Sequence, residues 1–238
     1  MTAVLQAENI VKVLGQGAAE VHALKGVNVS LGTGELTLLM GPSGSGKTTL
    51  LSILGCILSP TEGAVSVGGQ STEGAEPEEL ADLRRRNIGF VFQSYHLFPT
   101  LTATDNVRLA LDVRGERGRK AVSRARDALA MVGLAHKLTS FPGQMSGGEQ
   151  QRVAIARAIV GDASAILADE PTAALDSENG HAIMTILSEI ASDAARGVLV
   201  VTHDPRLLPF ATRIVRIEDG RIVSEEQGQA KRKVKANA

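Results

Sequence analysis

One glycine-rich segment, GPSGSGKT at residues 41–48, limits what this chain of 238 residues can fold into. It fits the pattern G-x-x-x-x-G-K-[ST] and lies between an apolar run, Glu35–Met40, and a run of helical character, TLLSILGCIL. Because glycine lacks a Cβ, successive backbone N–H groups can curve around a phosphate, and the following helix directs its positive end to the same point. The sequence therefore predicts a strand, a phosphate-binding loop and a helix.

The side chains of this loop have separate chemical tasks in a phosphate-loop site. Lys47 should reach the β- and γ-phosphates, the Thr48 hydroxyl should ligate Mg²⁺, and Thr49 is expected to bond the α-phosphate. The full set assigned to the nucleotide here is Gly41, Pro42, Ser43, Gly44, Ser45, Gly46, Lys47, Thr48 and Thr49. The competing interpretation is a glycine-rich turn with a chance Lys-Thr pair, and the flanking strand and helix disfavour it.

A second apolar run, SAILAD, ends on two adjacent carboxylates, Asp169 and Glu170. In phosphate-loop enzymes the acid that ends such a strand assists the magnesium ion, so Asp169 is predicted to serve the metal. Glu170 should point toward the γ-phosphate, where it can orient an attacking water or accept its proton. The alternative is structural: one acid that ends a strand and one that caps a helix.

Apolar strands alternate with helical segments, which predicts an α/β fold with a mostly parallel sheet. The ranges expected to be strands are 35–40, 88–93, 164–169 and 197–203, and the ranges expected to be helices are 49–58, 76–87, 146–160 and 178–195. Three short β-rich runs at 4–5, 10–13 and 27–31 come first, separated by turns. Residues 100–140, rich in Arg and Ala, are interpreted as a helical insertion.

Composition restricts the class of protein. A formal net charge of −1, one Tyr and no Trp argue against a nucleic-acid-binding platform. The single Cys56 excludes an intramolecular disulfide framework and fits a reducing compartment. The start of the chain lacks the pattern of a signal peptide, and no apolar run approaches the roughly 20 residues that span a bilayer. We expect a soluble, cytoplasmic protein that reaches a membrane only through another chain.

The segment MSGGEQQRVAIARAI, from Met145, predicts a second glycine-rich helix start. Ser146, Gly147 and Gly148 would present another positive, donor-rich helix end. A chain with one phosphate loop hardly needs a second such end for the same nucleotide. We therefore expect this end to face the γ-phosphate held by a second copy, in a head-to-tail dimer with two sandwiched nucleotides.

In order along the chain, GPSGSGKTT, FQSYHLFPTLT, MSGGEQQR, ILADEP, AALD and VVTHD resemble the motifs of ABC-transporter ATPases, and the likeness extends over nearly the whole chain. It implies an α/β P-loop NTPase (RecA-like) core, an N-terminal antiparallel β subdomain and an inserted α-helical subdomain. The implied division of a single ATPase domain is about 1–93 and 160–225 for the core and β subdomain, about 94–159 for the helical subdomain, and 226–238 for a polar, basic tail. We interpret the tail as a frayed end, with contact to anionic lipid as the alternative.

The resemblance also implies roles for single residues. Gln93 resembles the glutamine that senses the metal and the attacking water, and His203 resembles the histidine that contacts the γ-phosphate; the alternative for His203 is a strand-end loop cap. Ser146 to Glu149 resembles the family signature, with SGGE in place of the commoner SGGQ, and Asp176 resembles the aspartate that crosses the dimer interface. The implied catalytic set is Glu170, His203 and Gln93, and the implied magnesium set is Thr48, Gln93 and Asp169.

One position departs from the family pattern. The family usually places an aromatic side chain before the second strand, where it stacks on adenine, and Leu14 occupies that position here. Leucine covers the ring by apolar contact but forfeits a stacking contribution of roughly 0.5–1.5 kcal/mol. We expect weaker binding of the base and looser discrimination between ATP and GTP.

The resemblance implies an ATP- and Mg²⁺-dependent homodimer at the cytoplasmic face of the inner membrane, which drives a separate permease. The permease is expected to dock at residues 94–106, where Tyr95, Leu97, Phe98 and Leu101 gather. The chain is most similar to ATPases of macrolide-, lipoprotein- and glycolipid-exporting systems. The alternative is an ATPase that signals through a permease-like partner to a cell-envelope regulator. DNA-repair and translation ATPases fit less well, because this chain lacks a long coiled coil and a second cassette.

Overall fold

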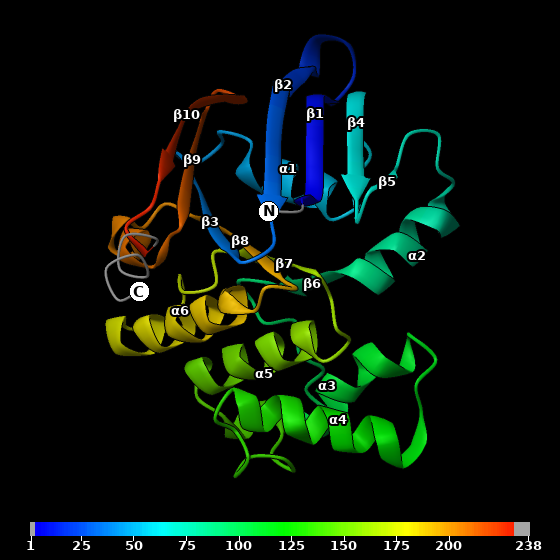
Figure 1. Cartoon of the computed structure of the whole chain (residues 1–238), viewed down its shortest axis with the longest axis vertical. Helices are drawn as coiled ribbons and strands as arrows, with labels where there is room; N and C mark the ends of the chain where they lie inside the picture. The colour runs from blue at the N-terminus through cyan, green and yellow to red at the C-terminus, as the bar shows by residue number, and fades with distance from the viewer. Residues whose placement is uncertain (1–2, 231–238) are drawn as a thin grey trace.

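Strands and helices alternate along most of the chain in the computed structural model, which describes residues 3–230 (Figure 1). The strands are β1 (Ala3–Leu14), β2 (Val21–Gly32), β3 (Glu35–Met40), β4 (Glu62–Val67), β5 (Gln70–Ser71), β6 (Ile88–Val91), β7 (Ala165–Asp169), β8 (Gly197–Thr202), β9 (Arg213–Glu218) and β10 (Arg221–Gln227). The helices are α1 (Lys47–Leu54), α2 (Pro77–Asn87), α3 (Ala103–Asp112), α4 (Gly118–Met131), α5 (Gly147–Ile159) and α6 (Ser177–Ser192). Three short 3₁₀ turns complete the order, at Gly17–Ala19, Pro142–Gln144 and Pro205–Phe210.

The larger sheet has six strands in the order β10-β9-β3-β8-β7-β6. All neighbouring pairs are parallel except β9 with β10, so the prediction of a mostly parallel sheet is confirmed. Every residue of β3 and β8 is buried, as expected for parallel strands that are covered on both faces. The carboxyl ends of β3, β7 and β8 therefore meet at one edge of this sheet.

The smaller sheet is antiparallel, in the order β2-β1-β4-β5. The prediction of short runs at 4–5 and 10–13, separated by a turn, is wrong, because both belong to the single strand β1. The pairing with β2 shifts register between Ala7 and Ile10, and Asn9 there has a left-handed φ of 50°. Asn28 Oδ1 accepts a hydrogen bond from the Asn9 backbone at 2.9 Å. A β-bulge, not a turn, thus accounts for the break in the pattern.

Helix α1 contacts strands of both sheets, and the residues around it form one of two hydrophobic cores. It ends at Leu54, four residues before the predicted end, and β6 ends at Val91, two residues early. Gly55 follows α1, and a Cβ there would lie 2.0 Å from the Phe90 ring. This close contact between the end of α1 and β6 requires glycine at position 55.

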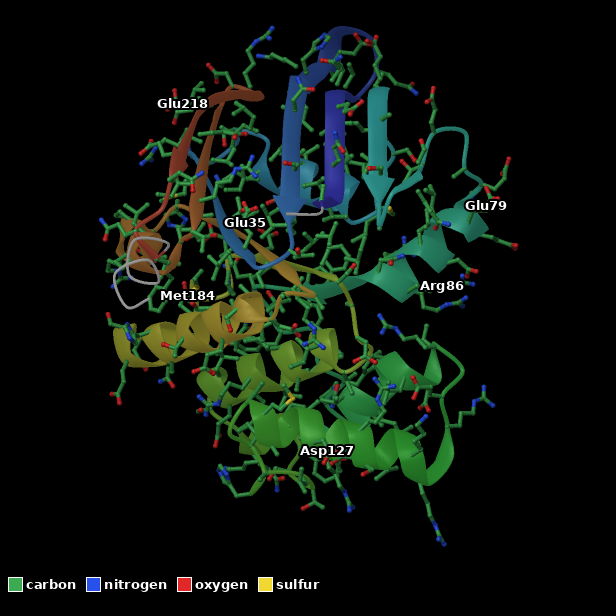
Figure 2. All side chains as sticks on the ribbon, viewed as in Figure 1. Glu35, Glu79, Arg86, Asp127, Met184 and Glu218 are labelled. Carbon is green, nitrogen blue, oxygen red and sulfur yellow. The ribbon has the colours of Figure 1, made fainter. Side chains whose placement is uncertain are left out.

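A layer of helices forms the second core against the other face of the larger sheet. Figure 1 shows α6 and α5 beneath the sheet, with α4 on the far side of α5. Helices α3, α4 and α5 contact one another, which agrees with the predicted helical insertion. No residue of helix α2 is fully buried, although Leu80 packs against the core around α1, and Figure 2 shows Glu79 and Arg86 on it at the edge of the molecule.

Strands β9 and β10 were not among the predicted elements. β10 reaches Gln227, two residues into the segment assigned to the tail. Residues 231–238 of that segment lie outside the described residues. Within residues 3–230, no helix has both the length and the apolar character that a membrane span requires.

Candidate active site

The loop between β3 and α1 turns its backbone amides toward open space. Gly46 is the N-cap of α1 and has a φ of 100°, which favours glycine, and a Cβ there would lie 2.6 Å from the Ala23 carbonyl oxygen. Among the described residues, the amides of Gly44, Gly46, Lys47 and Thr48 donate no hydrogen bond. Unpaired donors at a helix start form a site for a phosphate group.

The ammonium group of Lys47 lies inside this loop. Its Nζ donates to the carbonyl oxygens of Gly41 and Pro42, both at 2.7 Å. The side chain is buried, and no carboxylate forms an ion pair with it in the part of the chain that is described. Only carbonyl dipoles compensate this buried positive charge, so the site is suited to an anionic ligand.

The predicted metal residues Thr48 and Asp169 meet at the same edge. Asp169 ends β7, and its Oδ1 lies 3.4 Å from Thr48 Oγ1. Burial raises the pKa of Asp169, and the neighbouring charge of Glu170 raises it further, while Thr48 and Lys47 lower it. A carboxylate and a hydroxyl are ligands that Mg²⁺ accepts, and this ion usually keeps waters and phosphate oxygens as its other ligands.

Glu170 and His203 form the second pair at this edge. His203 Nδ1 lies 2.7 Å from Glu170 Oε1. The Glu170 side chain is 16% exposed and that of His203 is 68% exposed, so the pair opens to solvent through the histidine. The Glu170 amide donates to the Val201 carbonyl oxygen at 3.0 Å, which fastens the end of β7 to β8. Glu170 has a left-handed φ of 46°, which is uncommon for this residue type.

A pocket of about 420 Å³ continues from the loop to the smaller sheet. Leu14, the position at which the resemblance places the base contact, lines this pocket and is 41% exposed. Val21, His22 and Lys25 line it as well, and sequence reasoning missed all three. No local pattern in the sequence marks these residues as part of a pocket, because Val21 lies beside Leu14 only through the pairing of β1 with β2. The exposed aliphatic pair is a surface on which a base can lie.

The signature segment, Ser146–Glu149, caps helix α5. Ser146 Oγ accepts from the Glu149 amide at 3.2 Å, and Glu149 Oε2 accepts from the Ser146 amide at 2.8 Å. Lys137 Nζ lies 3.2 Å from Glu149 Oε1. The hydrogen bond from the Ser146 amide and the contact with Lys137 lower the pKa of Glu149. The glutamate that departs from the family pattern thus completes a capping box.

Asp176 caps the neighbouring helix, α6. It accepts from the Asn179 amide and from Asn179 Nδ2, both at 2.8 Å. A Cβ on Gly148 would lie 2.5 Å from Asn179 Oδ1, so the starts of α5 and α6 pack directly together. The signature segment and Asp176 are therefore one structural unit.

The predicted site residues fall into two groups within one chain. The loop, Asp169, Glu170 and His203 gather at the sheet edge, whereas Ser146–Glu149 and Asp176 lie at the starts of α5 and α6. Gln93 follows β6, whose Val91 pairs with Ala168, and is exposed. Among the described residues, Gln93 makes no side-chain hydrogen bond with Thr48 or Asp169.

Residues 94–106, the docking segment, border a groove of about 570 Å³. Phe98 is 56% exposed there, next to Phe90 and Phe92, whose rings stack. Arg84, Arg85, Arg114 and Arg157 also line the groove, and none of its lining residues is acidic. The groove is thus apolar with a basic rim.

Comparison with known proteins agrees with these observations. The family model described as "ABC transporter" matches residues 24–173. The lipoprotein-releasing system ATP-binding protein LolD of Bordetella pertussis is 44% identical over 218 residues, which cover 92% of this chain and 94% of that protein. The macrolide export ATP-binding/permease protein MacB of Salmonella choleraesuis is 42% identical over 233 residues, which cover 98% of this chain. The chain spans only about a third (36%) of the length of that relative.

Solved structures give the same result. A dimeric ATP-binding cassette, MJ0796, in a post-hydrolysis state bound to ADP and Pi superposes with a TM-score of 0.86 at 42% identity, over 94% of this chain and 98% of that chain. The chain CbiO1 of Clostridium perfringens, part of the ABC transporter complex CbiONQ, is 26% identical with a TM-score of 0.84 and is covered to 92%. The residues at the sheet edge, the two-sheet fold and these matches lead to one conclusion: the chain belongs to the ABC transporter family and is one of its ATPase domains.

Proposed function

We propose that this domain binds ATP with Mg²⁺ and hydrolyses it in a head-to-tail homodimer that drives a separate membrane permease. The observation that carries the proposal is the convergence of the phosphate loop, Asp169 and the Glu170–His203 pair at one sheet edge. Each of these groups has a place in phosphoryl transfer to water. The cytoplasmic face of the inner membrane is the proposed location.

Each group of residues at the sheet edge would have a separate task in ATP binding and hydrolysis. The free amides from Gly44 to Thr48 would bind the phosphates, and Lys47 would exchange its two carbonyl contacts for phosphate oxygens. Thr48 and Asp169 would hold Mg²⁺, with Gln93 nearby, and the ion would neutralise charge on the phosphates. Glu170 would orient the water and accept its proton. His203, hydrogen-bonded to Glu170, would hold that carboxylate in place and contact the γ-phosphate.

The dimer is proposed because the chain has a second donor-rich helix start. Ser146–Gly148 opens α5 and is not part of the phosphate loop, so a second copy would bring its signature segment to the nucleotide held by the first. The related cassette MJ0796 is described as dimeric.

The docking segment is the proposed contact with the permease. The groove beside Phe98 combines apolar walls with a basic rim, which suits a short helix of a partner. Because relatives carry the names of macrolide export and lipoprotein-releasing proteins, we assign the transporter to the exporters of hydrophobic compounds, lipids or lipoproteins.

The variant Glu170→Gln tests the catalytic assignment. An amide cannot accept the proton of the attacking water, so we expect hydrolysis to fall by about 10²–10⁴-fold. ATP binding should survive, and an ATP-bound dimer should accumulate. Phosphate release and light scattering measure the two effects. Near-normal turnover would refute Glu170 as the base, and Glu189→Gln on α6, away from the site, is the matched control.

A further inference from the structure

The docking segment contains two consecutive residues in an unusual backbone conformation. Tyr95 and His96 have φ values of 60° and 48°. Left-handed φ is uncommon for residues other than glycine and persists only where the surroundings hold it. Within the turn, the Tyr95 amide donates to the Phe92 carbonyl oxygen at 3.2 Å and the His96 amide to that of Ser94 at 2.6 Å, and the His96 ring stacks on the Phe92 ring.

Arg157, in the last turn of α5, holds this turn from outside. Its Nη2 donates to the Tyr95 carbonyl oxygen at 2.7 Å, and its Nη1 donates to the His96 carbonyl oxygen at 2.5 Å. Among the described residues, no carboxylate forms an ion pair with this guanidinium, and burial lowers the pKa of Arg157. Arg157 is only partly buried, and these two carbonyl groups partly offset the cost of removing its charge from water. The planar fork of arginine fits two adjacent carbonyl groups at once.

The other end of α5 touches the same turn. A Cβ on Gly147 would lie 2.8 Å from the Tyr95 hydroxyl, so the tyrosine covers the start of the signature segment. Gly147 and Arg157 belong to one helix of 13 residues. The turn at Tyr95–His96 is therefore fastened to α5 at both ends of that helix.

A buried asparagine on α3 shapes the remainder of the docking segment. Asn106 Nδ2 donates to the carbonyl oxygens of Phe98, Leu101 and Thr102 at 3.0–3.1 Å, and its Oδ1 accepts from the Phe98 amide at 2.8 Å. Helix α3 in turn packs on α5. The loop that carries Phe98 thus has defined contacts with the helical layer along its whole length.

We propose that Arg157 is a positioning residue that makes the docking segment and the signature helix α5 move as one body. A partner that displaces Phe98 would then move Ser146–Gly148 relative to the second copy's nucleotide, and ATP would move Phe98 in return. The inference rests on the proposed function, because it requires a permease that binds the docking segment and a signature segment that faces the nucleotide of a second copy.

The absence of tryptophan from the sequence allows a direct test. Phe98→Trp introduces a single fluorophore that borders the same groove as Phe90, which packs against the core around α1. In the Glu170→Gln background, addition of ATP should change its emission as α5 moves with the docking segment. We expect Arg157→Met and Arg157→Lys to lose this response while ATP-driven dimerisation, followed by light scattering, persists. Lysine keeps the charge but lacks the fork that binds two carbonyl groups.

Arg124→Lys is the matched control. Arg124 also lies in the helical layer and donates to a backbone carbonyl, that of Val160, at 2.7 Å, but it does not contact the docking segment. A normal response in Arg124→Lys together with a lost response in both Arg157 variants supports the proposal. A response retained in either Arg157 variant, or lost in Arg124→Lys, overturns it. If the Glu170→Gln background does not dimerise with ATP, the proposed function itself is wrong and the inference falls with it.

Discussion

At the residue scale, the adjacent acids Asp169 and Glu170 contact different partners. Asp169 is in the strand and faces Thr48 at 3.4 Å, whereas Glu170 has a φ of 46° and reaches His203 at 2.7 Å. This left-handed conformation costs about 1–2 kcal/mol. Strain of this kind is concentrated at functional sites.

Leu14 gives a prediction at the same scale. Leu14→Tyr should tighten ATP binding by about 2- to 10-fold, because an aromatic ring adds roughly 0.5–1.5 kcal/mol of stacking to the aliphatic pair formed with Val21. Titration with a fluorescent ATP analogue and competition with GTP measure the affinity and the discrimination. Val223→Tyr, at an exposed position on β10, is the control. An unchanged affinity in Leu14→Tyr would remove the base-binding role from this position.

At the element scale, α5 connects several functional regions. Its capping box holds the signature segment, Gly148 packs against Asn179 of α6, and Arg157 near its end holds the docking segment. Helix α5 also lies against the sheet that carries the catalytic edge, since it contacts β6. A change at any of these contacts can therefore reach the others through one rigid helix.

The capping box of α5 gives a prediction for stability. Glu149→Ala should lower the free energy of unfolding at neutral pH by about 0.5–1.5 kcal/mol, because it removes the hydrogen bond that Glu149 Oε2 accepts from the Ser146 amide and the contact with Lys137. The pKa of Glu149 is lowered in the folded state, so its contribution is present at neutral pH and is lost as the pH falls below the ordinary glutamate value of about 4.3. Urea unfolding at pH 7 and pH 4 should show the difference between the wild type and Glu149→Ala shrinking at the lower pH. A difference that stays constant between the two would contradict a role for the charged carboxylate, and Glu149→Gln should keep the cap but lose the pH dependence.

At the scale of the whole molecule, the fold separates two half-sites. Parallel strands bring the phosphate loop, Asp169, Glu170 and His203 to one edge, while the helical layer carries the signature segment elsewhere. One copy can therefore bind a nucleotide without completing its site. In the proposed dimer, assembly would therefore depend on ATP.

The half-site arrangement predicts that assembly and binding can be uncoupled. In the Glu170→Gln background, Ser146→Arg should leave ATP affinity of the monomer unchanged, because Ser146 does not line the pocket of its own chain. The same variant should fail to form the ATP-dependent dimer, since a bulky cation would occupy the interface. Calorimetry at low protein concentration and light scattering at high concentration measure the two effects. Ser123→Arg on α4 is the control, and a normal dimer in Ser146→Arg would refute the head-to-tail arrangement.

Much of the fold follows from local patterns in the sequence. The strand–loop–helix around GPSGSGKT, the buried strands β7 and β8 and the helix start at Ser146 all agree with prediction. Buried parallel strands read as continuous apolar runs, and helix caps and phosphate loops depend on residues a few positions apart. The prediction placed a turn near Asn9, because the sequence of a β-bulge within one strand resembles that of a turn between two strands.

The sequence alone thus determined the family, the phosphate loop and the identity of the acids at the sheet edge. Only the tertiary structure decided that Glu170 pairs with His203, that Val21 joins Leu14 in the base pocket, and that Arg157 holds the Tyr95–His96 turn. The reason is the distance along the chain. The residues of a motif are neighbours in the sequence, whereas these pairs form only after sheet register and helix packing have brought separate segments together.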